Sequence, residues 1–76
     1  MTPFETLANA IIEQAAKDYR LALRYHFKHP ENTKYKREVT EIEQFFRSDW
    51  YYALTDVDGE YLIREIRRRV RMKVAV

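Results

Sequence analysis

The stretch that decides the fold is EIEQFFRSDWYYALTDVDGEYLIREIRRRV, residues 41–70. It begins with a dense group of aromatic side chains, continues into an acidic turn that carries the only glycine, Gly59, and ends in an arginine-rich segment. The aromatic side chains are Phe45, Phe46, Trp50, Tyr51 and Tyr52. A large apolar surface, a bend and a cationic segment thus follow one another closely, which is typical of a small helical domain that binds a partner.

The size of the chain predicts a single domain over residues 1–76, near the lower limit at which one hydrophobic core holds a fold. The absence of cysteine excludes a disulfide framework, a thiolate metal site and a thiol nucleophile. No apolar run approaches the roughly 18 residues of a membrane span, and the N-terminus lacks the apolar region of a secretory signal. We therefore expect a soluble intracellular protein that contacts no membrane.

The first long helix has clear start and stop signals. Thr2 and Glu5 form a capping box, and Pro3 fits the first helical position. Pro30 disfavours helical geometry in the residue before it, so the helix should end near Lys28.

The rest of the chain predicts two further long helices. Asn32 or Thr33 can open the second helix, and Ser48 either caps a short separate helix or lies inside the second one. Thr55 and Asp58 form another capping box, which predicts a third long helix over residues 56–72. The expected fold is all-α: an antiparallel bundle of three long helices with a short extra helix around residues 48–54.

Apolar residues at helical spacing predict the buried side of each helix. These residues are Phe4, Ala8, Ile11, Ala15, Tyr19, Ala22 and His26 in the first helix, Tyr35, Val39, Ile42 and Phe46 in the second, and Leu62, Ile63, Ile66 and Val70 in the third. We also expect Trp50 in the core. Either Tyr51 or Tyr52 is left as the exposed aromatic anchor of a binding surface, because tyrosine has an apolar ring and a polar tip.

Charge is distributed unevenly around a net value of +2: residues 1–16 carry −2, residues 17–37 +5, residues 38–60 −6 and residues 61–76 +5. The cations form two groups at helical spacing, both predicted to contact a macromolecule. They are Lys17, Arg20, Arg24 and Lys28 on the first helix, and Arg64, Arg67, Arg68 and Arg71 on the third, extended by Arg69 and Lys73. Side by side, they would suit nucleic-acid phosphates. Each group could instead be the solvated side of an amphipathic helix.

The acidic middle of the chain supports a contrary hypothesis. Its carboxylates could present anions to a basic partner that itself binds nucleic acid. They are Glu38, Glu41, Glu43, Asp49, Asp56, Asp58 and Glu60.

The sequence gives little support for a metal-binding site or a catalytic site. Asp58 and Gly59 resemble part of a calcium loop, but Leu54 stands where the first ligand should be. His26 and His29 are too few for zinc without cysteine or a placed carboxylate. No acid and base are placed across a cleft, so we expect no metal, no cofactor and no enzyme.

The stretch FFRSDWYYALTDVDGEYLI (residues 45–63), followed by Arg64-Glu65-Ile66-Arg67, resembles short uncharacterised helical proteins of prophages and integrative mobile elements of Gram-positive bacteria. The likeness covers residues 10–70. It implies a mobile-element protein in the cytoplasm of a bacterial host, and it brings no catalytic residues. Proteins of this size from such elements often act by occupying a host complex, as anti-CRISPR inhibitors of nucleases do.

The leading hypothesis is therefore a non-enzymatic protein that binds and inhibits a host nucleic-acid-handling defence complex, so that its partner is a host protein or nucleoprotein complex. The first alternative is an accessory protein that binds DNA or RNA directly through the basic helix faces. The second alternative is a structural protein that associates with itself as a homodimer.

Overall fold

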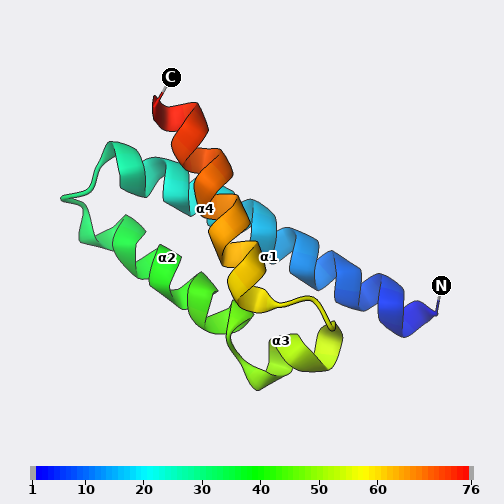
Figure 1. The fold of residues 1–76 in the computed structure, drawn as a ribbon. Helices are drawn as coiled ribbons and strands as arrows, with labels where there is room; N and C mark the ends of the chain where they lie inside the picture. The colour runs from blue at the N-terminus through cyan, green and yellow to red at the C-terminus, as the bar shows by residue number, and fades with distance from the viewer. Residues whose placement is uncertain (1, 76) are drawn as a thin grey trace.

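The computed structural model describes residues 2–75, so Met1 and Val76 lie outside the described residues. These residues form four helices and no strand, which confirms the predicted all-α fold. The helices are α1 (Pro3–Lys28), α2 (Thr33–Phe46), α3 (Asp49–Leu54) and α4 (Gly59–Ala75). In Figure 1, α1 and α2 run antiparallel side by side, and α4 starts near the end of α2 and crosses α1.

Helix α1 begins and ends where its signals predict. The Thr2 side chain accepts a hydrogen bond from the Glu5 amide at 3.1 Å, and His29 is the C-cap that precedes Pro30. With 26 residues the helix is about 39 Å long, close to the 41 Å length of the molecule. Its first turns project beyond α3 (Figure 1) and leave Phe4, expected in the core, 59% exposed.

Ser48 separates α2 from α3, which answers a question that the sequence left open. Asn32 caps α2, since its side chain accepts a hydrogen bond from the Lys34 amide at 2.9 Å. The Ser48 hydroxyl donates to the Phe45 carbonyl at 2.6 Å and accepts from the Tyr51 amide at 3.2 Å. One hydroxyl thus satisfies the end of one helix and the start of the next.

Helix α4 starts at Gly59, three residues later than the predicted start at residue 56. The Thr55 hydroxyl accepts from the Val57 amide within the turn, whereas the Asp58 carboxylate accepts from the Glu60 amide at 3.0 Å, so Asp58 is the effective cap. Gly59 then begins the helix against the end of α2: a Cβ at this position would lie 2.0 Å from the Phe46 carbonyl oxygen. We infer that the close approach of Gly59 to Phe46 places the start of α4 at the glycine rather than at residue 56.

The core lies where α1, α2 and α4 meet, and its largest members are aromatic. Tyr19, Phe46 and Tyr51 are fully buried, and Phe46 contacts the other two rings edge to face, with centroids 5.7 and 5.6 Å away. Such pairs add about 0.5–1.5 kcal/mol beyond the buried area. The other buried residues are Ala8, Ala22, Leu23, Val39, Ile63, Ile66 and Val70.

The expectation that Trp50 is a core residue is wrong. Its side chain is 59% exposed on α3, whereas Tyr51, the next residue, is fully buried. The two residues lie on different sides of a six-residue helix. The side of α3 that turns inward is decided by the Ser48 cap and by the packing of Tyr51 against Phe46.

Candidate functional site

The two predicted groups of cations differ sharply in their surroundings. The α4 group of Arg64, Arg67, Arg68 and Arg71 is largely engaged within the protein. Three members of the α1 group, Lys17, Arg20 and Arg24, border a groove that they share with cations of α4.

Arg67 belongs to an internal network rather than to a free basic face. Its guanidinium donates to the Glu43 carboxylate at 2.6 and 3.0 Å and to the Tyr19 hydroxyl at 3.0 Å. The Tyr19 hydroxyl in turn donates to Glu43 at 2.5 Å. These three residues come from α4, α2 and α1, so the network joins all three long helices.

The network shifts the acid–base properties of its members. Burial alone would raise the pKa of Glu43, but the hydrogen bonds from Tyr19 and Arg67 outweigh it and hold the pKa below its ordinary value. Burial and the neighbouring Glu43 carboxylate raise the pKa of Tyr19. Glu43 is therefore a charged structural residue. Arg67, predicted as a contact to a macromolecule, is paired within the protein rather than free.

The remaining arginines on this side of α4 also have local partners. Arg68 pairs with Glu65 at 3.2 Å. Arg64 lies over the ring of Tyr61, and Arg71 over the ring of Phe27, at 5.8 and 5.6 Å from the centroids. Arg47 and Glu60 form a further ion pair beside Arg64 and Arg71, in the same shallow hollow. On this surface, carboxylates pair with Arg47 and Arg68, and aromatic rings contact Arg64 and Arg71.

The strongest candidate site is the groove between α1 and α4, which we call the basic groove. It encloses about 800 Å³. Its cations are Lys17, Arg20, Arg24, Arg68, Arg69 and Lys73, and its apolar members are Leu21, Ile66, Val70 and Met72. Among residues 2–75, no carboxylate lines it. Apart from Arg68, none of these cations forms an ion pair within residues 2–75.

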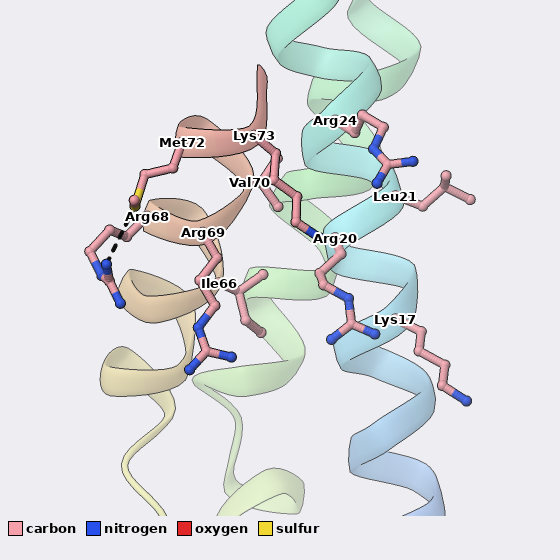
Figure 2. A pocket seen from close by; sticks show the side chains of 10 residues that line it. All are labelled: Lys17, Arg20, Leu21, Arg24, Ile66, Arg68, Arg69, Val70, Met72 and Lys73. Atoms are coloured by element: carbon pink, nitrogen blue, oxygen red, sulfur yellow. Dashed lines mark hydrogen bonds between the residues drawn. The ribbon is translucent and has the colours of Figure 1, made fainter. Parts of the chain in front are cut away.

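Figure 2 shows how the cations lie around the groove. Arg20 of α1 and Lys73 of α4 reach into the space between the helices, and Arg69 extends beside Ile66. Arg68 turns toward Met72 on the outer side of α4, where its guanidinium lies 3.5 Å from the sulfur. Lys17 and Arg24 extend from α1 on the side away from α4 in the same view. The charge between the two helices therefore comes from Arg20, Arg69 and Lys73, and Lys17 and Arg24 continue it along α1, a geometry suited to a polyanion.

Two cations of the basic groove, Arg69 and Lys73, were named from the sequence only as an extension of the α4 group and not among its principal binding residues. Each lies three residues after a buried residue of α4, Ile66 or Val70, so each borders the buried stripe on the side toward α1. Arg67 borders that stripe on its other side. Helical spacing could have identified both borders, but only the packing reveals which one faces Glu43. The predicted Lys28 is exposed at the end of α1, outside the groove.

The sequence left open whether Tyr51 or Tyr52 is the exposed aromatic anchor, and the structure excludes one of the two. Tyr51 is fully buried, and its hydroxyl has no hydrogen-bond partner in the structure, so a role for Tyr51 at the surface is wrong. Tyr52 is about half exposed, but its hydroxyl accepts a hydrogen bond from the Gly59 amide at 3.0 Å and thereby supports the turn before α4.

Within residues 2–75, no three histidine, aspartate or glutamate side chains lie close enough together to hold a metal ion. None of the helices in this range combines the length and apolar character needed to cross a membrane. Comparisons of the chain with models of protein families, with curated proteins and with solved structures find no match in any of the three.

Proposed function

We propose that this protein acts by binding rather than by catalysis, and that the basic groove binds the phosphate backbone of a nucleic acid. The observation that carries the proposal is a set of five cations that two helices contribute to one groove. Among the described residues, none of the five forms an ion pair and no carboxylate lines the groove. Unpaired cations keep their full attraction for phosphate. Three of the five are arginines, whose guanidinium matches phosphate bidentately.

The salt dependence of binding tests this proposal quantitatively. Five phosphate contacts predict a slope of log K against log salt of about −3.5 for a single strand and about −4.5 for a duplex. Between 50 and 200 mM salt the affinity should therefore fall about 100-fold to 500-fold. Fluorescence anisotropy with labelled 20-nucleotide RNA, single-stranded DNA and duplex DNA measures these slopes.

A matched pair of variants identifies the surface. Reversing Arg24 and Arg69 to Glu removes two of the five contacts and should make the single-strand slope shallower, to about −2.1. Reversing Arg64 and Arg71 to Glu changes the net charge equally but lies outside the basic groove, so the slope should stay near its original value. An equal loss in both variants would mean that only the overall charge matters, and the groove would then have no specific role.

The biological setting that we propose is inhibition of a host defence complex in a bacterium. This setting rests on the resemblance to proteins of prophages and mobile elements that we infer from residues 45–67. Anti-CRISPR inhibitors are one kind of small non-enzymatic protein from such elements. Within this setting, the bound nucleic acid is the RNA or DNA held by the host nuclease complex, and its occupation blocks the complex. An accessory protein that binds free DNA or RNA is the second candidate, favoured by the same groove.

A purified RNA-guided nuclease separates the two candidates. An inhibitor should reduce cleavage by the loaded complex and bind it more tightly than the bare guide RNA, whereas an accessory protein should bind bare and complexed nucleic acid alike and leave cleavage intact. The Arg24/Arg69 variant serves as the negative control in both cases. Full inhibition by this variant would overturn the role of the groove.

A further inference from the structure

A second surface lies along α1 on the side of α2 and α3 and meets the basic groove at Leu21. It has the properties of a protein docking site. Two hollows follow one another along α1 and meet at Asp18, and we call them together the α1–α2 trough. The first is bordered by Phe45 and Trp50, and the second by Tyr35 and other residues of α2. Along α1 the trough extends from Ala10 to Tyr25, about 22 Å or four helical turns.

The trough combines exposed apolar side chains with an acidic rim. Ile11, Leu21 and Trp50 supply apolar surface, and Leu21 and Trp50 are 49% and 59% exposed. The rim carries three carboxylates, Asp18, Glu38 and Glu41, against the single cation Lys34. None of these carboxylates forms an ion pair within the described part of the chain. Figure 2 shows Leu21 on the side of α1 that faces away from α4.

The apolar surface also continues toward the N-terminus. Phe4 and Leu7 are exposed, and with Ile11 they recur at the three- and four-residue spacing of one helix face. An exposed apolar face of this length marks an interaction surface.

We propose that the α1–α2 trough binds a basic amphipathic helix of a partner protein. An amphipathic helix in a groove presents apolar anchors about every three or four residues, which fits a straight trough four turns long. Lysines or arginines on the flanks of such a helix would pair with the acidic rim. The proposed partner is thus complementary in both shape and charge.

Other occupants fit the charge less well. Nucleic-acid phosphates and anionic lipid headgroups would both be repelled by Asp18, Glu38 and Glu41. A two-fold dimer through this face would bring the acidic rim of one copy toward the same rim of the other. A basic helix is the occupant that gains from all three carboxylates of the rim, which outnumber Lys34.

The single tryptophan provides a direct readout, since Trp50 borders the trough and no other residue contributes tryptophan fluorescence. The probe is a designed 18-residue helix without tryptophan, with leucines at positions i, i+3, i+4 and i+7 of each repeat and lysines elsewhere. Its binding should shift the emission of Trp50 to shorter wavelengths in a saturable manner. The same peptide with glutamate in place of lysine should leave the emission unchanged, even if it enters the basic groove.

Two matched substitutions locate the site. Leu21→Lys removes an apolar contact and adds a repulsive charge, so peptide affinity should fall roughly tenfold. Val57→Lys makes the same kind of change at an exposed position that lines neither the trough nor the basic groove, and it should leave the affinity unchanged. Because both positions are exposed, circular dichroism should show that both variants fold.

Three results would overturn this proposal: equal binding of the glutamate peptide, no response of Trp50, or equal effects of the two substitutions. Light scattering supplies the test for a second copy. A dimer that Leu21→Lys dissociates would assign the trough to self-association instead of a basic helix. Failure here leaves the nucleic-acid slopes of the basic groove unaffected, because none of the cations of that groove lines the trough and the two tests use different probes.

Discussion

Replacing Glu43 by alanine removes the carboxylate that joins the three long helices, and its cost can be worked out from the structure. The Glu43 side chain is 12% exposed, while its partner Arg67 is 34% exposed. Removing one partner of a buried ion pair costs about 3–5 kcal/mol. Water can reach Arg67 and recover part of that loss. The buried Tyr19 hydroxyl also loses its acceptor, which costs about 1–3 kcal/mol.

We therefore expect Glu43→Ala to lower the free energy of unfolding by about 2 kcal/mol, after discounting for the solvation of Arg67. For a chain of this size, that change lowers the unfolding midpoint by about 8–16 °C. Thermal denaturation followed by circular dichroism measures the shift. Glu41→Ala is the matched control, because Glu41 is exposed on the same helix without an ion pair, and its effect should stay within about 0.5 kcal/mol.

A double-mutant cycle tests whether the network is the cause. Tyr19→Phe should destabilise the wild-type protein by about 1 kcal/mol, because it removes the hydroxyl that donates to Glu43. In the Glu43→Ala background the same substitution should cost much less, since the acceptor is already gone. Equal effects of Glu43→Ala and Glu41→Ala, or strict additivity with Tyr19→Phe, would refute the assignment of a joint role to these residues.

Three further predictions follow from single positions. Tyr51→Phe should raise stability by about 1 kcal/mol, because it removes a buried hydroxyl without a hydrogen-bond partner; an unchanged or lower midpoint in urea denaturation would contradict this. Gly59→Ala should lower the free energy of unfolding by about 1–3 kcal/mol, because the added Cβ would meet the Phe46 carbonyl oxygen. This loss should outweigh the better helix propensity of alanine. Thermal denaturation checks the prediction, and a more stable variant would disprove the close contact. Since the folded state holds the pKa of Glu43 below its ordinary value, the stability it contributes is present above about pH 4.3 and is lost as the pH falls through the lower pKa of the folded state. Urea midpoints between pH 7 and 3 should therefore decline more for wild type than for Glu43→Gln, and parallel declines would contradict this role.

The helices were predictable because their signals are local. Thr2, Asn32 and Ser48 each accept a hydrogen bond from a backbone amide two or three residues further along the chain, so a few neighbouring residues determine where α1, α2 and α3 begin. The start of α4 was misplaced because it depends on the contact of Gly59 with the distant Phe46. A capping motif read from the sequence carries no information about such a contact.

The candidate sites were less predictable, because binding depends on which side of each helix remains free. The sequence by itself determined the all-α fold, the buried stripes and the existence of two cationic helices, since these follow from the periodicity of polar and apolar residues. Only the tertiary structure decided that Arg67 pairs with Glu43, that Arg69 and Lys73 face α1, and that Trp50 stays outside. The physical reason is that these outcomes depend on how α3 and α4 are oriented against α1 and α2, and that orientation is set by packing between residues far apart in the chain.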